Sequence, residues 1–151
     1  MTTIAWDGSV LAADRLVAAG DTLAGYEKKL AAFDVQTHAH KGVCAATGTV
    51  DDIAAFIWWV KKFPVLDSDP PTIHDDDFMG VAIINGVLME YGKGLNGNRV
   101  KYKAAWGGGA DFAIAYMDLV EGGGAVGAVK YAATRHLGTG GEVDSYEVEL
   151  P

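Results

Sequence analysis

The sequence predicts an α+β protein in which antiparallel strands and helices form separate layers. Two dipeptides that favour tight hairpin turns, Asp7-Gly8 and Asn85-Gly86, are each flanked by strand-like segments. Apolar residues at helical spacing occur in other segments, after each run of strands. Runs of strands joined by hairpins, rather than by crossover helices, are typical of an α+β layered fold.

Composition limits the class of protein. The chain has 151 residues, enough for one domain with a sizeable core, and half of them are hydrophobic, with no run as long as a membrane span. Twelve basic and 20 acidic residues give a net charge of −8, which argues against nucleic acid as a main partner. No basic segment precedes an apolar stretch at the start, so we expect no secretion signal and a cytoplasmic location.

The N-terminal third is predicted to consist of strands. Residues 2–17 have the pattern of two strands around Asp7-Gly8, and residues 22–48 continue as further strands. The alanine-rich runs in 22–48 are also compatible with helix, but the glycines and β-branched residues favour strands.

The first helix is predicted over residues 49–63. Thr49, followed three residues later by Asp52, resembles a capping box at its start. One residue of the Trp58-Trp59 pair must lie off the inward face, which favours a subunit contact there. The inward face is the one that carries Ile53, Phe56, Ile57 and Val60.

Strand-like and helix-like spacing of apolar residues predicts the remaining elements. The second helix is expected to present one face with Phe112, Ala115, Tyr116 and Leu119. In chain order, the sequence predicts a loop at 64–77, a hairpin at 78–94, a strand at 99–109 that ends in glycines, a third helix at 125–136 and a closing strand at 142–150.

Two motifs that suggest cofactor chemistry fit ordinary structure better. The glycines of residues 92–97 match a dinucleotide-binding pattern, but a strand-like segment follows where that site needs a helix, so we expect a hairpin loop. His38 and His40 have no third metal ligand, and residues 74–77 lack the spacing of a calcium loop. We therefore expect no metal and no cofactor.

The single cysteine, Cys44, lies in an apolar stretch of small residues. One thiol cannot form an internal disulfide, and this setting favours a buried small hydrophobic residue over a nucleophile.

The threonine behind the initiator methionine has a distinctive chemical use. A free N-terminal threonine carries a hydroxyl and an α-amine whose usual pKa, about 7.7–8.0, leaves part of it unprotonated near neutral pH. The amine can then act as the base that activates the hydroxyl. Methionine excision tolerates small second residues, so removal of Met1 would expose Thr2 in this form.

Thr2 stands at the head of an ordered series of motifs. The stretch "TTI", a hairpin, "AADR", "KKL" and "ATGTVDD" resembles the proteolytic subunits of the proteasome and of the bacterial HslV protease. "AAWGGGADFAIAYMDL" and "AATRHLGTGGEVDSYEV" are similar to the later part of those subunits. The resemblance covers nearly the whole chain and implies one domain, 1–151, with the four-layer αββα sandwich of N-terminal-nucleophile hydrolases.

The resemblance assigns roles residue by residue. It implies that Thr2 is the nucleophile, that Lys29 lowers the pKa of its amine and hydroxyl, and that Asp14 pairs with Lys29. It implies that the backbone N–H of Gly48 binds the oxyanion. His136 stands where the family usually has an aspartate, so a hydrogen-bonding role near Thr2 and a role as a helix C-cap both remain open.

Two further positions carry residues that differ from those usual in the family. Gly108 replaces the usual serine near the threonine amine, whereas Thr139 replaces a serine conservatively. The resemblance also implies a first specificity pocket that is mostly small and apolar, with one carboxylate, and therefore a preference for apolar side chains before the scissile bond. Its lining would be Val17, Glu27, Ala31, Ala46 and Val50.

The implied function is that of a threonine-type endopeptidase acting on peptides or unfolded proteins inside a homo-oligomeric ring or double ring. The likeness to HslV suggests an ATP-dependent unfoldase as a partner. Two alternatives stay open at this point. One is a catalytically silent structural subunit, favoured by Gly108 and His136, and the other is an amidase of the same fold that acts on small molecules.

Overall fold

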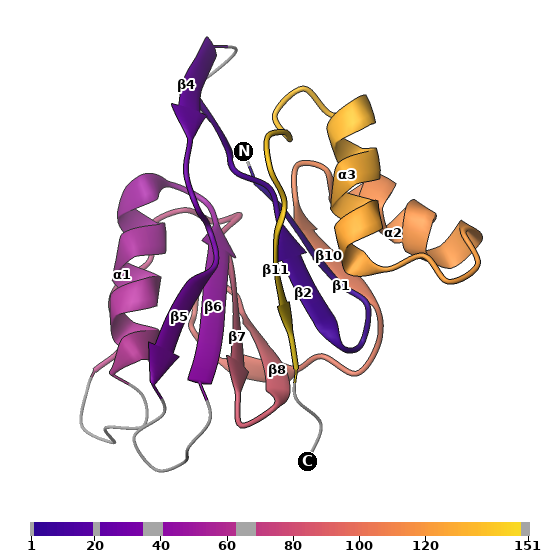
Figure 1. Cartoon of the computed structure of the whole chain (residues 1–151). Helices are drawn as coiled ribbons and strands as arrows, with labels where there is room; N and C mark the ends of the chain where they lie inside the picture. The colour runs from indigo at the N-terminus through magenta and orange to yellow at the C-terminus, as the bar shows by residue number, and fades with distance from the viewer. Residues whose placement is uncertain (1, 20–21, 35–40, 63–68, 149–151) are drawn as a thin grey trace. The chain divides into compact units, whose positions relative to one another are not determined.

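The computed structural model contains antiparallel sheets and three helices among the residues it describes (Figure 1). It divides into two compact units. The first unit takes Met1–Leu30 and Lys101–Glu149, and the second takes Ala31–Val100. The described residues are 2–19, 22–34, 41–62 and 69–148.

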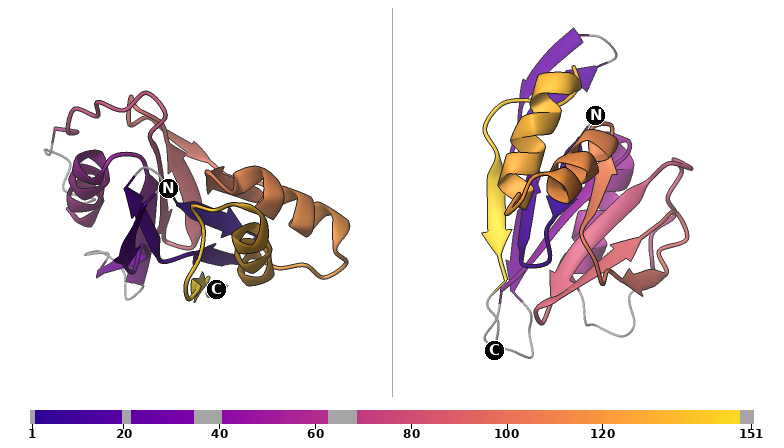
Figure 2. Two further views of the ribbon diagram at one scale, coloured as in Figure 1. Left: turned by 90° about the horizontal axis from the view of Figure 1, so that it is seen from above. Right: turned by 90° about the vertical axis from the view of Figure 1, so that its right-hand side faces the viewer.

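The first unit contains a four-stranded antiparallel sheet in the order β10-β1-β2-β11, and helices α2 and α3 lie side by side on one of its faces (Figure 2). Ala5 and Ala12 of the sheet pack against Met117 and Val129 of the helices. The small sheet residues let the helices approach closely. The elements are β1 (Thr3–Trp6), β2 (Val10–Ala13), β10 (Ala104–Gly107), β11 (Asp144–Glu147), α2 (Ala110–Leu119), α3 (Ala125–Arg135) and a separate hairpin of β3 (Leu16–Ala19) and β4 (Thr22–Tyr26).

The second unit contains a five-stranded antiparallel sheet in the order β5-β6-β7-β8-β9, covered on one face by α1. The ring of Phe56 lies 5.5 Å from the rings of Phe78 and Tyr91, measured between centroids. Gly80 leaves room for Phe56, since a Cβ there would come within 2.5 Å of its ring. The elements are β5 (Ala31–Asp34), β6 (Lys41–Thr47), β7 (Met79–Ile84), β8 (Val87–Tyr91), β9 (Gly97–Arg99) and α1 (Val50–Lys61).

Both predicted hairpin turns are confirmed. Gly8 has a φ of +109°, and the Asp7 carboxylate accepts hydrogen bonds from the backbone N–H groups of Ser9 and Val10. Its second oxygen accepts from Ala125 N at 2.9 Å, at the start of α3. Burial acts to raise the pKa of Asp7, but these hydrogen bonds together hold it below the usual value. One turn residue therefore closes the first hairpin and caps a helix far away in sequence.

The capping residues of α1 behave only in part as a capping box. The Thr49 hydroxyl accepts from Asp52 N at 3.4 Å, as expected. The Asp52 carboxylate instead accepts from His74 N and Asp75 N, at 2.8 Å for the shorter contact. The bond from Asp75 N is the main reason why the pKa of Asp52 is lowered. This carboxylate fixes residues 74 and 75, which the sequence analysis considered as metal ligands.

The apolar face expected for α2 is covered only in part, since Tyr116 of that face packs against the core. Ala113 and Met117 are buried, whereas Leu119 is 83% exposed and Phe112 37% exposed. Apolar residues lie on two sides of this short helix, and packing against the sheet selected the side that carries the small alanine. The predicted strand at 99–109 is also shorter than expected, since β10 begins only at Ala104.

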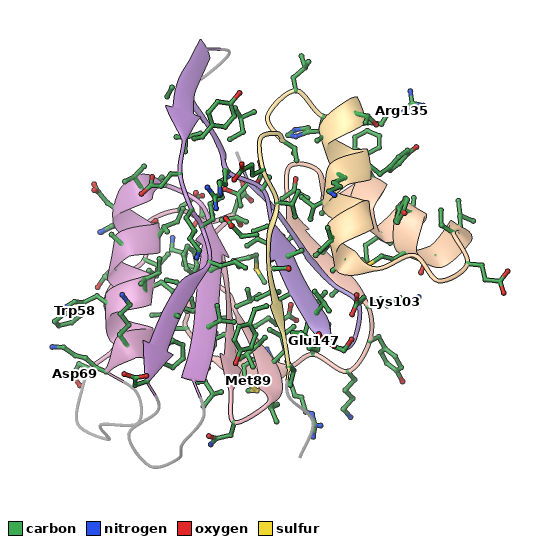
Figure 3. The ribbon with its side chains drawn as sticks, viewed as in Figure 1. Trp58, Asp69, Met89, Lys103, Arg135 and Glu147 are labelled. Carbon is green, nitrogen blue, oxygen red and sulfur yellow. The ribbon has the colours of Figure 1, made fainter. Side chains whose placement is uncertain are left out.

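Cys44, Trp58 and the loop of residues 92–97 lie as expected from the sequence. Cys44 is buried, and burial raises the pKa of its thiol to about 12. Trp58 projects away from the sheet of its unit, with Lys62 Nζ 3.4 Å from the centroid of its ring (Figure 3). Strand β9 begins at Gly97 and pairs antiparallel with β8, as expected for a hairpin loop before it. No helix in the described part of the chain is long and apolar enough to cross a membrane.

Candidate active site

Asp14 is the centre of a hydrogen-bond network in the first unit. It follows β2 directly, and its side chain is fully buried. One carboxylate oxygen accepts from Thr3 N at 3.1 Å and from Lys29 Nζ at 2.8 Å, and the other accepts from Gly140 N at 3.0 Å. A buried charge is stable only when it is paired and hydrogen-bonded, and these three donors meet that condition.

Asp14 and Leu16 both accept hydrogen bonds from Lys29. The ammonium donates to the Asp14 carboxylate and, at 2.6 Å, to the carbonyl of Leu16. The side chain is only 11% exposed. Burial lowers the pKa of Lys29, and the nearby Asp14 carboxylate partly opposes that effect. The result is a cation fixed in position beside the start of β1.

Thr2 precedes β1 and is 8% exposed. Its carbonyl accepts a hydrogen bond from Gly108 N at 3.0 Å, and the next residue, Thr3, is paired with Gly107 in the β1–β10 ladder. The N–H of Thr3 is the group bound by Asp14. The peptide unit that joins Thr2 to Thr3 is therefore fixed on both sides, and the Asp14–Lys29 pair lies next to it.

A second network connects Thr3 with the end of α3. The Thr3 hydroxyl accepts from Gly109 N at 3.1 Å and lies 2.7 Å from the Thr139 hydroxyl oxygen. Thr139 Oγ1 in turn lies 2.8 Å from His136 Nδ1. Gly109 has no room for a side chain, since a Cβ would come within 2.3 Å of Thr3 Oγ1. His136 is also the C-cap of α3, so both roles considered for it are compatible with its position.

The structure brings several predicted site residues together in the first unit. Asp14 binds Lys29 directly and the chain at Thr3, and the link through Thr139 connects His136 to the same strand. Two predicted pocket residues also belong to this unit. Val17 pairs with Gly25 in the β3–β4 hairpin, and Glu27 follows β4 with its N–H bonded to Arg15 O at 2.7 Å.

The other predicted site residues belong to the second unit. Gly48 lies between β6 and the N-cap of α1 with a φ of +140°, a conformation that favours glycine. Ala46 is buried in the core with α1, Ala31 is partly buried against the same core, and Val50 is 77% exposed at the first position of the helix.

Sequence reasoning missed the role of Thr3. The two threonines at the start and Thr139 are both visible in the sequence, but no local pattern shows that residues 136 positions apart form a hydrogen bond. It also missed Arg15, which makes a two-pronged ion pair with Asp144 of β11, with contacts of 2.8 and 2.6 Å. This pair fixes the backbone next to Asp14.

Candidate metal ligands do not converge. In the part of the chain that the structure describes, no three His, Cys, Asp or Glu side chains are placed to hold an ion. His38 and His40 lie outside the described residues.

No family model matches the sequence, and no curated protein matches it. Solved structures do match. HslV from Trypanosoma brucei is 17% identical, with 97% of this chain and 98% of that chain covered and a TM-score of 0.64. The Anbu complex from Pseudomonas aeruginosa, described as a helical assembly, is 14% identical, with 97% and 80% covered and a TM-score of 0.67. This chain has a proteasome-like fold.

A third match adds a ligand. Thiobacillus denitrificans BPH in complex with epoxomicin is 16% identical, with 99% of each chain covered and a TM-score of 0.59. At these identities the matches show the proteasome-like fold alone. The fold resemblance seen in the sequence is confirmed by these structures.

Proposed function

We propose that this chain is a threonine-type endopeptidase in which Thr2, exposed by removal of Met1, is the nucleophile. The observation that carries the proposal is the buried Asp14 carboxylate, which binds both the Lys29 ammonium and the amide directly after Thr2. An ion pair of this kind is costly to bury and is not needed to close the β1–β2 hairpin. Its place beside a threonine at the chain start supports a catalytic use.

The proposed mechanism uses Thr2 as both nucleophile and base. The free α-amine takes the proton of the hydroxyl, and the oxygen attacks the peptide carbonyl. The positive charge of Lys29 favours the less positive forms of both groups, and Asp14 keeps Lys29 charged and oriented. The N–H of Gly48 is proposed to bind the oxyanion, in keeping with its open backbone conformation before α1.

We also propose the four-layer αββα arrangement for the complete domain, 1–151. Its support is that the proteasome-like neighbours match over almost the whole chain, and that the four-stranded and the five-stranded sheet each pack against helices on one face among the described residues. The pocket before the scissile bond is proposed to be lined by Val17, Glu27, Ala31, Ala46 and Val50. Small apolar side chains in that set favour apolar residues in the substrate.

The proposed substrates are peptides or unfolded proteins, and the proposed assembly is a homo-oligomeric ring or double ring in the cytoplasm. The helical assembly of the Pseudomonas Anbu complex supports self-association of this fold. Enclosure would keep the site from folded proteins. An ATP-dependent unfoldase is proposed as the partner that delivers substrates, from the likeness to HslV.

A catalytically silent subunit is the second candidate. Gly108 has no hydroxyl to offer near the Thr2 amine, and His136 is bonded to Thr139 and so connects with Thr3. A silent subunit would keep the fold and the Asp14–Lys29 pair without hydrolysis. An amidase for small molecules is the third, and panels of peptide and small-amide substrates distinguish it.

Covalent labelling tests the proposed function. Epoxomicin, an epoxyketone, requires both the hydroxyl and the free amine of an N-terminal threonine. We expect a 1:1 adduct by mass spectrometry, mapped to the peptide that begins at Thr2, in a chain that has lost the mass of Met1. Absence of an adduct in a sample whose Met1 has been removed would refute the peptidase assignment. Full retention of Met1 after native expression would favour the silent subunit.

Adjacent lysines provide a matched test of the Asp14–Lys29 pair. Lys29 is mostly buried against Asp14, whereas Lys28 is exposed. Replacing Lys29 by methionine is expected to lower kcat/KM for a fluorogenic peptide by about 100-fold or more, because the amine and hydroxyl of Thr2 lose a neighbouring positive charge. Lys28→Met is expected to change it less than twofold. Equal rates in two folded variants would remove Lys29 from the mechanism.

A further inference from the structure

The hydrogen bonds that join Thr3, Thr139 and His136 have a donor-to-acceptor order that the geometry determines. We infer that Thr3 and Thr139 are positioning residues, which hold the neutral imidazole of His136 in the tautomer with its proton on Nε2. The catalytic use of that proton rests on the proposed function. The direction of the hydrogen bonds does not, because it follows from the buried contacts alone.

The hydrogen bond between Gly109 and Thr3 has a fixed direction. The Gly109 N–H can only donate, so Thr3 Oγ1 accepts this bond. Thr3 is fully buried and Thr139 is 4% exposed, so both hydroxyls lie in a buried environment. Within the described residues, the Thr3 hydroxyl has one other partner, the Thr139 hydroxyl, and Thr139 Oγ1 has that contact and His136 Nδ1.

The number of protons available to the Thr3, Thr139 and His136 side chains determines the direction of the other two hydrogen bonds. Two contacts, Thr3–Thr139 and Thr139–His136, each need one proton, and the two hydroxyls supply two. If Nδ1 also carried a proton, three protons would compete for two contacts. One hydroxyl proton, on Thr3 or on Thr139, would then lie buried without an acceptor. Such a group loses its full hydration without compensation, so the arrangement with an unprotonated Nδ1 is favoured.

The consequent order is a relay in one direction. Gly109 N–H donates to Thr3, Thr3 donates to Thr139, and Thr139 donates to Nδ1 of His136. The neutral ring then carries its proton on Nε2 and can offer only a hydrogen-bond donor at that atom. In the proposed peptidase, any hydrogen bond that His136 makes through Nε2 is therefore one that it donates. The α-amine of Thr2 remains the base.

Nuclear magnetic resonance of the ring nitrogens tests the relay. The full-length protein is labelled with ¹⁵N-histidine, and Nδ1 and Nε2 of His136 are identified by comparison with His136→Gln at pH 8, where histidine side chains are mostly neutral. We expect an Nδ1 shift typical of an unprotonated nitrogen and an Nε2 shift typical of a protonated one. In Thr139→Val, the two shifts are expected to move toward each other, as the tautomers mix.

Two variants separate the relay from loss of structure. Thr139→Ser keeps the hydroxyl and is expected to restore the wild-type shifts. Thr134→Val changes another threonine of the α3 segment, whose hydroxyl donates to Tyr131 O, and is expected to leave them unchanged. A protonated Nδ1 in the wild type would overturn the inference, and so would identical shifts in the wild type and Thr139→Val. These shifts need no enzymatic activity, so failure of the proposed function would leave this result interpretable.

Discussion

Thr2→Ala is expected to remove hydrolysis while the protein stays folded. Loss of a nucleophile lowers kcat by several powers of ten, so we expect a fall of about 1,000-fold or more for a peptide substrate. The carbonyl of residue 2 keeps its hydrogen bond from Gly108 N in the variant, so the midpoint of thermal unfolding should change little. Fluorogenic peptide assays and thermal unfolding measure the two effects on the same samples.

Thr2→Ser is the matched control for this substitution. Alanine and serine are both small enough for methionine excision, and serine keeps a hydroxyl beside the amine. We expect Thr2→Ser to retain measurable hydrolysis and epoxomicin labelling, and Thr2→Ala to show neither. Mass spectrometry confirms that Met1 is absent from each variant. Hydrolysis by Thr2→Ala at the wild-type rate would show that another residue is the nucleophile.

Asp14→Ala is expected to destabilise the fold strongly, by about 3–5 kcal/mol in the free energy of unfolding. The substitution removes the carboxylate that balances the buried Lys29 ammonium. It also removes the acceptor for two backbone N–H groups, those of Thr3 and Gly140. Chemical denaturation followed by circular dichroism measures the loss.

Asp144→Ala is the comparison for Asp14→Ala. Its ion pair with Arg15 is also close, at 2.6 Å, but the Arg15 side chain is 32% exposed, so water screens the interaction. We expect a loss of about 1 kcal/mol or less for this variant. Adding Lys29→Met to Asp14→Ala should recover part of the stability, because the buried charge is removed with its partner. Equal losses for the two aspartate variants would contradict the central role of Asp14.

Much of the local structure could be predicted from the sequence. The turns at Asp7-Gly8 and Asn85-Gly86 formed as expected, because their dipeptides favour the required backbone conformations over a few residues. The Thr49 cap formed for the same reason. The buried face of α2 was not predictable, since apolar residues occur on more than one side and only the sheet determines which side is covered.

The candidate site combines contacts between residues that are close in the sequence with contacts between residues that are far apart in it. The Asp14–Lys29 pair was expected from the resemblance to proteasome-type subunits, and the structure contains it. The link of Thr3 to Thr139 and His136 joins residues more than 130 positions apart. No periodicity or turn signal specifies such a contact.

The sequence by itself therefore determined most of the strands and the helices, and the resemblance to proteasome-type subunits supplied the residues proposed for chemistry near the N-terminus. Only the tertiary structure decided that Asp7 caps α3, that Asp52 binds residues 74 and 75, and that the Thr3 hydroxyl connects to His136. The physical reason is that a buried polar group must find a partner, and which partner is near depends on how distant segments pack. Local patterns in the sequence do not specify which distant segments come into contact.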